Sequence, residues 1–224
     1  MEWQAAGGIE WLEARLPGSK AIFSTRSAGS IKESYVPLAA ALGISPEMVV
    51  SGRQVHGAGL AFHEVALADT PEVDGHVIAE PGVVGLVYVA DCLPVALAGP
   101  GGIAMLHCGW RGLAGGIVSS GAAAVGATHA AIGPGIGPCC YEVGEEVLGV
   151  FSGLGNGVAA GRMLDLPEVT RRLLRESGVG EIESADLCTC CEEELFFSHR
   201  RDAGPGRQAG LAWVEAGGAG RCPA

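Results

Sequence analysis

One stretch of the chain limits its folds more than any other: the nearly continuous apolar run V-V-G-L-V-Y-V-A at residues 83–90. A run of this length without alternating polar residues is typical of a strand that is buried on both faces of its sheet. The sheet that contains it must therefore lie between two other layers. A further short strand is predicted at 49–55, and short apolar runs predict strands at 95–98, 103–108 and 130–133.

Four helices are predicted between and after these strands, at residues 35–42, 112–126, 141–151 and 165–177. Apolar side chains recur at four-residue spacing in the last two, as one buried helix face requires. The second is rich in Gly and Ala, which would let it lie very close to a sheet. Because strands and helices are interleaved, we predict a mixed α/β (α+β) fold in which helices flank central β-sheets, within one domain spanning 1–224.

The composition argues against several classes of function. The 224 residues include 25 acidic residues and 14 Lys or Arg, which gives a formal net charge of −11, whereas nucleic-acid-binding proteins usually carry a basic surface. The first residues lack the basic and apolar segments of a signal peptide, and the apolar stretches are too short or too interrupted for a membrane helix. We therefore predict a cytoplasmic, monomeric protein that acts on a small molecule and has no nucleic-acid or membrane partner.

Three side chains of the metal-ligand type fall where predicted strands end. Cys92 follows the apolar run in A-D-C, His107 closes the next one, and His56 follows the strand predicted at 49–55. Strand ends hold side chains firmly, and the adjoining loops leave room for a ligand. Two His and one Cys with an open position suit catalytic zinc, so we predict one catalytic metal site. The residues alone leave open a Cys–His nucleophilic pair, or unrelated positions in turns and core.

Basic and amide side chains near this set are candidate substrate contacts. Arg111 lies at the start of the Gly-rich helix, where a guanidinium and a helix N-terminus together would favour phosphate. An ion pair with Asp91 or Glu142 is the alternative for this arginine. Arg53 and Gln54 lie just before His56 in the segment R-Q-V-H, and we predict that they either contact substrate or brace the loop.

Two aspartates and a basic segment complete the predicted site. Asp91 should point away from the neighbouring cysteine by strand alternation, so we predict that it supports the site by accepting a hydrogen bond from a ligand histidine. Asp74 precedes a glycine and is interpreted as a turn residue. Phe197, Arg200 and Arg201 are predicted to close the substrate pocket, with a solvated basic face as the alternative.

The sequence contains eight cysteines, several of them in adjacent pairs. Without a secretion signal, reduced thiols are the default state. The C-T-C-C run at 188–191 is not followed by the second C-x-x-C that a zinc ribbon requires. We therefore predict buried or mildly reactive thiols at this run rather than a structural metal.

Seven blocks resemble, in order, the YfiH/DUF152 family, whose members have been called laccase-domain or polyphenol oxidase proteins and later purine nucleoside phosphorylases. They span about residues 22–215, and A-D-C and H-x-G-W-R-G are the most specific. The blocks are F-S-T-R (23–26), R-Q-V-H-G (53–57), V-D-G (73–75), A-D-C-L-P-V (90–95), H-C-G-W-R-G (107–112), I-G-P-G-I-G-P-C-C-Y-E-V (132–143) and F-F-S-H-R-R-D (196–202).

The resemblance implies zinc held by His56, Cys92 and His107, with copper as the other metal that the family names suggest. It implies a fold similar to that of the deamidase toxins, with a purine nucleoside and phosphate as substrates. The implied reactions are phosphorolysis of adenosine, inosine, guanosine and methylthioadenosine, and deamination of adenosine. Cys108 stands where the family usually has Ala, His199 where it has Tyr, and the segment after F-S-T-R is shortened.

Two alternative functions remain from the sequence. One is a Cys–His amide hydrolase that edits peptidoglycan precursors, which would use the same residues. The other is a copper-binding protein of the polyphenol oxidase type, because two His and one Cys also bind copper. The six histidines form no H-x-H pair, which argues against an authentic multicopper mechanism.

Overall fold

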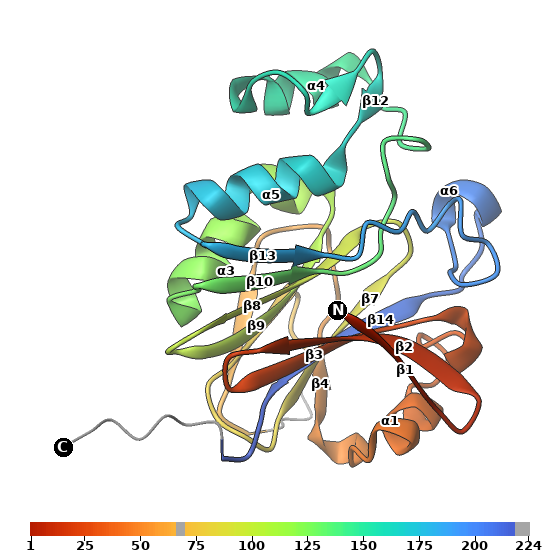
Figure 1. Ribbon diagram of the computed structural model, residues 1–224, viewed down its shortest axis with the longest axis vertical. Helices are drawn as coiled ribbons and strands as arrows, with labels where there is room; N and C mark the ends of the chain where they lie inside the picture. The colour runs from red at the N-terminus through yellow and green to blue at the C-terminus, as the bar shows by residue number, and fades with distance from the viewer. Residues whose placement is uncertain (66–69, 218–224) are drawn as a thin grey trace.

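The computed structural model describes residues 1–65 and 70–217, which form two stacked β-sheets between helices (Figure 1). Helix α1 (Val36–Leu42) packs on the outer face of the first sheet. Helices α3 (Ile117–Val125) and α5 (Leu166–Glu176) cover the outer face of the second. This layered, mixed α/β arrangement confirms the predicted fold class.

The first sheet has the strand order β1-β2-β3-β14-β7-β4, so a strand from near the end of the chain lies in its middle. Strand β14 pairs with β3 on one side and β7 on the other, both antiparallel. Only β4 and β7 are parallel neighbours. The bounds are β1 (Glu2–Ala6), β2 (Ile9–Leu16), β3 (Ser19–Ser24), β4 (Val49–Ser51), β7 (Val84–Val89) and β14 (Gln208–Val214).

The second sheet has the order β13-β10-β8-β9-β6-β5. Its outer pairs, β10 with β13 and β5 with β6, are parallel, whereas the inner pairs are antiparallel. A separate two-stranded ribbon precedes α5. The bounds are β5 (Leu60–His63), β6 (Gly75–Ile78), β8 (Leu93–Gly99), β9 (Gly102–Cys108), β10 (His129–Ile132), β13 (Glu181–Ser184), and, in the ribbon, β11 (Ala159–Ala160) and β12 (Met163–Leu164).

Three short helices complete the described part of the chain: α2, α4 and α6. Single 3-10 turns occur at Arg26–Ala28, Pro46–Met48 and Ser152–Leu154. The bounds of the helices are α2 (Trp110–Ala114), α4 (Glu145–Phe151) and α6 (His199–Asp202).

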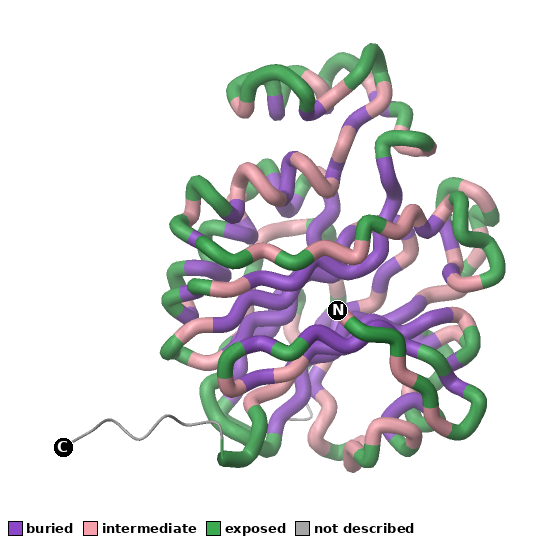
Figure 2. The backbone as a smooth tube through the Cα atoms, viewed as in Figure 1, coloured by how far each residue is buried: buried purple, intermediate pink, exposed green. Residues whose placement is uncertain are grey.

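One buried core lies between the two sheets, where the tube in Figure 2 is almost entirely buried, and a larger one lies between the second sheet and its helices. Phe23 and Val87 of the first sheet and Ala96 and Met105 of the second belong to one buried cluster. Burying apolar area contributes about 25 cal/mol per Å², so this interface holds the two sheets together. The edges of the sheets are consequently fixed relative to each other, which matters for the site described below.

Several predicted elements are confirmed. The run at 83–90 forms β7, which is an interior strand between β14 and β4. The helix predicted at 165–177 is α5, and the Asp165 carboxylate caps it by accepting a hydrogen bond from the Glu168 N–H at 2.9 Å. The helix predicted at 35–42 is α1, which ends at Gly43 in the left-handed region.

Other predicted elements are shorter than expected, and glycines explain each difference. The strand predicted at 49–55 stops at Ser51: Gly52 passes so close to Val73 that a Cβ would lie 2.7 Å from the valine side chain, and the Arg53 N–H donates to the Pro71 carbonyl instead of to β7. The helix predicted at 112–126 is two helices, since Gly116 between them has φ 85°. Residues 141–143 are not helical, and α4 begins only after Gly144.

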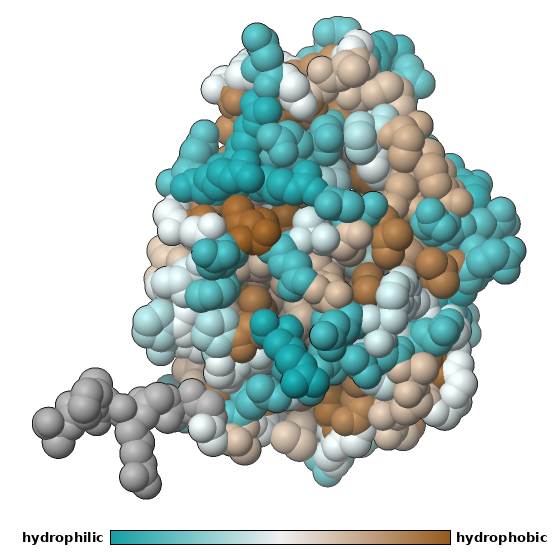
Figure 3. Space-filling view, viewed as in Figure 1, coloured by the Kyte–Doolittle hydropathy of each residue, from teal (hydrophilic) through white to brown (hydrophobic). Residues whose placement is uncertain are grey.

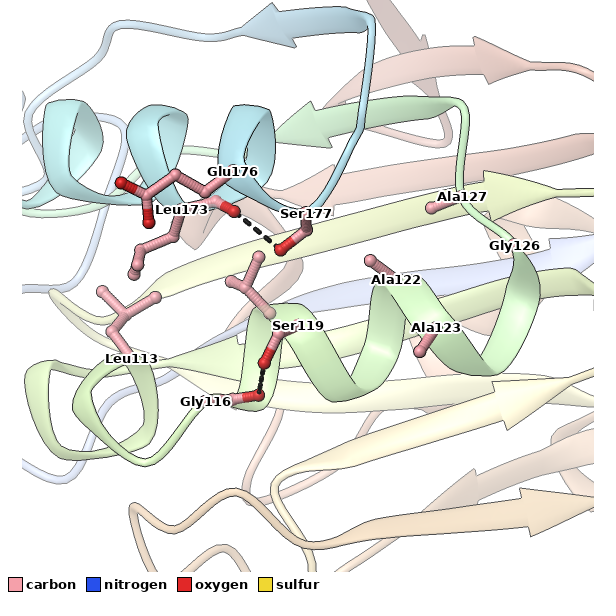
Figure 4. A pocket seen from close by; sticks show the side chains of 11 residues that line it. Leu113, Gly116, Ser119, Ala122, Ala123, Gly126, Ala127, Leu173, Glu176 and Ser177 are labelled. Carbon is pink, nitrogen blue, oxygen red and sulfur yellow. Dashed lines mark hydrogen bonds between the residues drawn. The ribbon is translucent and has the colours of Figure 1, made fainter.

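The surface gives two further observations. In Figure 3, hydrophilic side chains form a band over α5, the exposed face of that amphipathic helix. Small and apolar side chains such as Ala122 and Leu173 line a groove between α3 and α5 (Figure 4), and the volume of this groove is about 520 Å³. Across 1–65 and 70–217, the helices are too short or too polar to span a bilayer.

Candidate functional site

The three ligand-type residues meet at one edge of the second sheet. The chain leaves β7 in the first sheet, turns at Asp91 with φ 86°, and enters β8 in the second sheet directly after Cys92. His107 lies on the neighbouring strand β9, where it pairs with Pro94 of β8. The loop after β4 brings His56 to the same edge. A ligand atom from each of these three residues lies within 4.8 Å of the other two.

The two imidazoles and the thiol surround a small space that is open to the cavity on one side. The rings of His56 and His107 have centroids 4.8 Å apart and are nearly perpendicular, at 73°. His107 is buried, Cys92 is partly buried and His56 is exposed. The backbone of His56 has φ 59°, a conformation that residues other than Gly adopt infrequently. A ligand can therefore approach the three donors from the side of His56.

Asp74 holds this arrangement in place. Its carboxylate is fully buried and lies 2.7 Å from Nδ1 of His107. It also accepts hydrogen bonds from the backbone N–H groups of Val55, His56 and Gly57. Because the carboxylate holds the proton on Nδ1, Nε2 of His107 is left free to act as a ligand. One residue thus fixes the ring of one histidine and the loop that carries the other.

This finding corrects two interpretations from the sequence. Asp74 is not a simple turn residue, and the hydrogen bond from a ligand histidine that we predicted for Asp91 belongs to Asp74. Asp91 instead accepts hydrogen bonds from Thr189 Oγ1 at 2.7 Å and from the Arg200 backbone N–H at 2.6 Å. Asp91 therefore positions the segment that carries Arg200.

The protein environment favours a charged pair within the site. Burial alone would raise the pKa of the Cys92 thiol, but hydrogen bonds with His107 and His56 lower it to about 6. Burial alone would lower the pKa of His107, but its hydrogen bonds with Asp74 and Cys92 raise it to about 9. At neutral pH the metal-free site is therefore a thiolate beside an imidazolium, the ionisation state in which sulfur is already a strong ligand or nucleophile.

A metal ion fits the donors. One thiolate and two imidazoles are borderline-soft ligands that suit zinc or copper, and the open side provides the free position of a catalytic site. Gly109 keeps the site clear, since a Cβ at this position would lie 2.9 Å from Cys92 Sγ and 3.4 Å from Cδ2 of His56. This explains why the motif H-C-G-W-R-G has glycine at that point, which the sequence alone did not reveal.

The open side faces a cavity of about 850 Å³, within the usual range for small-molecule sites. Its walls come from both sheets and from the loops at their shared edge. Its lining is locally basic although the chain is acidic, as an anionic substrate requires. Lining side chains include the ligand-type residues, the bases Lys32, Arg53, Arg111, Arg200 and Arg207, and the aromatic residues Tyr88, Trp110 and Tyr141.

Arg111 and Arg200 are the arginines best placed to bind an anion. Each guanidinium lies over an aromatic ring, Arg111 over Trp110 at 4.5 Å and Arg200 over Tyr141 at 5.3 Å. Neither is ion-paired within the part of the chain that the structure describes, so the alternative of a salt bridge for Arg111 is not observed. Helix α2 has only five residues, so its dipole adds little to the charge of Arg111.

The other predicted substrate contacts differ from these two. Gln54 uses its amide to donate to and accept from the backbone of Tyr88, at 2.9 and 2.7 Å, and so braces the loop. Arg53 lines the cavity but pairs with Glu72. Arg201 does not line it: its guanidinium donates to Asp202 and to three backbone carbonyls of residues 189–196. The structure therefore makes Arg201 a structural residue, contrary to the prediction.

Sequence reasoning missed three aromatic residues of the cavity, as well as the bases Lys32 and Arg207. Trp110 lies within the H-C-G-W-R-G block and Tyr141 within the C-C-Y-E-V block, so their motifs contained a signal that we did not use. Tyr88 points into the cavity from β7, within a run that we interpreted only as buried. No spacing rule in the sequence brings these three rings together.

Taken together, the fold and the site define a layered α/β protein with a Cys/His metal-type site beside a basic cavity. The chain belongs to the family described as multi-copper polyphenol oxidoreductase laccase, whose sequence profile matches residues 24–215. It is 40% identical to a Deinococcus radiodurans protein named purine nucleoside phosphorylase, over 84% of this chain and 77% of that one. A Streptomyces coelicolor protein with the same activity in its name is 33% identical over 95% and 93%.

Solved structures of YfiH-type proteins share the fold. The crystal structure of YlmD from Geobacillus stearothermophilus has a TM-score of 0.83 and 29% identity, covering 96% of this chain and 99% of that one. A DUF152 protein from Neisseria meningitidis has a TM-score of 0.80 and 29% identity, covering 92% and 99%. The resemblance to the YfiH/DUF152 family that the sequence blocks indicated is thereby confirmed.

Proposed function

We propose that this protein is a zinc-dependent purine nucleoside phosphorylase that acts on adenosine, inosine, guanosine and methylthioadenosine, and that also deaminates adenosine. The observation that carries the proposal is the convergence of His56, Cys92 and His107 on the open side of a basic, aromatic cavity. Relatives that are 33–40% identical and are named purine nucleoside phosphorylase support the reaction class.

The cavity offers each part of the substrates a suitable partner. Trp110, Tyr88 and Tyr141 present aromatic groups on which a purine can stack. Arg111 has a planar guanidinium group that can bind two phosphate oxygens. Arg200 donates from Nη1 to the carbonyls of Cys140 and Glu142, which leaves its Nε and Nη2 groups for phosphate. In phosphorolysis, a phosphate oxygen bonds to the anomeric carbon of the ribose while the bond from that carbon to the purine nitrogen breaks. The two arginines would hold the phosphate for that attack and screen its charge.

His56, Cys92 and His107 would hold the metal, which when bound supplies a Lewis acid that polarises a substrate oxygen. The protein's own contribution is to keep these donors ready. Asp74 retains the proton on Nδ1 of His107, so that Nε2 faces inward. The buried position of Asp74 also fixes the backbone of the loop at His56, which limits movement of the donors when substrate enters.

The test is phosphate-dependent release of adenine from adenosine by protein of measured metal content, with and without a chelator. Replacing Arg111 by Ala should raise the KM for phosphate about 10- to 100-fold, because a hydrogen-bonded charge contributes about 1.5–3 kcal/mol. Arg175→Ala, at an exposed position on α5, is the matched control and should leave KM unchanged. Zinc-loaded protein that ignores adenosine but cleaves a muropeptide amide would refute the phosphorylase proposal.

The charge state of the site favours one rival, a Cys–His amide hydrolase acting on peptidoglycan precursors. The lowered pKa of Cys92 and the raised pKa of His107 are what a thiolate nucleophile and its partner require. Full activity in metal-free protein, abolished by Cys92→Ala, would support this rival.

Copper is the other metal for the same ligands, in keeping with the family description, and metal analysis of the purified protein separates it from zinc.

A further inference from the structure

A second group of metal-ligand side chains lies outside the site described above. The loop after β10 carries Cys139 and Cys140, and the loop after β13 carries Cys188 and Cys191. The four sulfur atoms all lie within 4.8 Å of one another. Cys139 Sγ is 3.3 Å from Cys191 Sγ, and Cys140 Sγ is 3.5 Å from the same atom.

The fold explains why residues about fifty positions apart meet. Strands β10 and β13 are parallel neighbours, so both loops leave the sheet at the same edge (Figure 1). A further bridge between Gly135 and Cys188 extends this parallel pairing past the ends of the strands. The C-T-C-C run is not followed in the sequence by a second pair of cysteines. In the fold, Cys139 and Cys140 of the loop after β10 provide that pair.

We propose that Cys139, Cys140, Cys188 and Cys191 form a structural zinc site. A tetrahedral zinc ion with bonds of about 2.3 Å to sulfur places its four sulfur atoms about 3.8 Å apart. The observed separations, from 3.3 Å to no more than 4.8 Å, bracket this value without rearrangement of the loops. Four protein ligands with no open position are typical of structural rather than catalytic zinc.

The backbone around the cluster suits a metal thiolate. Cys188 and Cys191 have C-x-x-C spacing, and the Gly137 N–H donates a hydrogen bond to Cys188 Sγ at 3.3 Å. Gly137 lies directly beside the cluster: a Cβ at this position would be in ordinary van der Waals contact with Cys139 Sγ at 3.4 Å and Cys188 Sγ at 3.7 Å. Four thiolates around Zn²⁺ carry a net charge of −2, which such N–H donors help to stabilise.

A disulfide explains the arrangement less well. Cys191 Sγ lies 3.3 Å from the sulfur of Cys139 and 3.5 Å from that of Cys140, and a sulfur atom can form a disulfide with only one of them. A disulfide would leave two crowded thiols unused, whereas one ion uses all four. Zinc binding needs no oxidant, because the thiols release protons as they coordinate.

Such a site would clamp the wall of the cavity rather than take part in the reaction. Tyr141, which lines the cavity, directly follows Cys140. Arg200 donates to the Cys140 carbonyl, and Arg201 donates to the Cys190 carbonyl. Zinc would therefore hold together the two loops that present the Tyr141 ring and the Arg200 guanidinium. This inference is independent of the reaction proposed for the cavity.

The test measures zinc in purified protein by elemental analysis, in a Cys92→Ser background that weakens the first site. We expect one zinc per chain in this background and none when Cys139→Ser or Cys191→Ser is added. Cys190→Ser is the matched control, because it alters a thiol in the same loop outside the proposed ligand set, and it should retain the zinc. Cobalt loaded into the Cys92→Ser protein should give the intense sulfur-to-metal charge-transfer bands of a tetrathiolate.

Three results would overturn the proposal. The Cys92→Ser protein could contain no zinc and give no tetrathiolate spectrum with cobalt. Peptide mapping of protein purified and alkylated without oxygen could show a disulfide between Cys139 or Cys140 and Cys191. Finally, Cys190→Ser could lose the metal as fully as Cys139→Ser does, which would refute the ligand set. The cobalt spectrum needs no substitution in the cluster, so it remains decisive if the cluster variants fail to fold.

Discussion

Replacing Asp74 by Asn is the sharpest test of how the site is built. Asp74 Oδ1 receives the His56 N–H and Nδ1 of His107, and Oδ2 receives the N–H groups of Val55 and Gly57. Asn has the same shape but only one acceptor oxygen. In either orientation of the amide, its NH₂ group therefore faces two of these four donors.

The expected cost follows from this count. A hydrogen bond to a charged group contributes about 1.5–3 kcal/mol, so losing two at the lower value costs about 3 kcal/mol of unfolding free energy. The His107 ring also loses the group that fixes its proton, and loss of such a partner typically lowers metal affinity about 10- to 100-fold. We thus expect Asp74→Asn to bind zinc about 10- to 100-fold more weakly and to unfold at lower urea concentration.

Zinc affinity is measured by competition with a chromophoric chelator, and stability by urea unfolding of the metal-free protein. Asp186→Asn is the matched control, because this exposed carboxylate pairs with Arg171 at the surface, where an ion pair contributes about 0–1 kcal/mol. Wild-type zinc affinity in Asp74→Asn, with unchanged stability, would refute the role assigned to this carboxylate.

Three further predictions concern pH and packing. Burial and the charge of a neighbouring histidine hold the pKa of His76 at about 3, against about 6.5 in the unfolded chain. Because only the unfolded chain takes up this proton between pH 6.5 and pH 5, the free energy of unfolding is highest above pH 6.5 and falls by about 2 kcal/mol by pH 5. Urea unfolding across this range tests it, and an NMR titration of His76 near pH 6.5 would contradict it. In metal-free protein, alkylation of Cys92 by iodoacetamide should rise with a midpoint near pH 6, since burial is outweighed by hydrogen bonds from two imidazoles; a midpoint near 8.5 would refute the pairing. Gly99→Ala should destabilise by about 3 kcal/mol because its Cβ meets the backbone of 125–126, whereas Gly149→Ala, with open space in α4, should stabilise by about 0.5–1 kcal/mol. Thermal melts compare the last two, and equal melting temperatures would contradict the packing argument.

The sequence predicted the interior of the second sheet better than the first. Its central strands β8 and β9 are apolar runs, and these can be recognised without knowing their neighbours. In β2 the apolar run is interrupted by Glu13, which is buried beside Lys20 and Arg15. The charge of Glu13 hid a buried strand, because one of the bases that pair with it, Lys20, lies on the neighbouring strand β3.

The site shows the same division. His56, Cys92 and His107 stand next to recognisable strands and motifs, so they could be proposed from the sequence. Asp74 could not be assigned, because its partners lie 17–33 positions away and meet it only after the sheets stack. Likewise, nothing in the pair Arg200-Arg201 indicates that only the first reaches the cavity, since this depends on the direction of each side chain on the short helix α6.

The central position of β14 has a consequence for how the protein is made. A ribosome releases β1–β3 and β7 long before residues 208–214 emerge, yet β14 is the strand that joins them. Until then, β3 and β7 each present an unpaired edge, the kind of surface that associates with other chains. Pairing over such sequence separation is slow, so the first sheet can be completed only after residues 208–214 have been made.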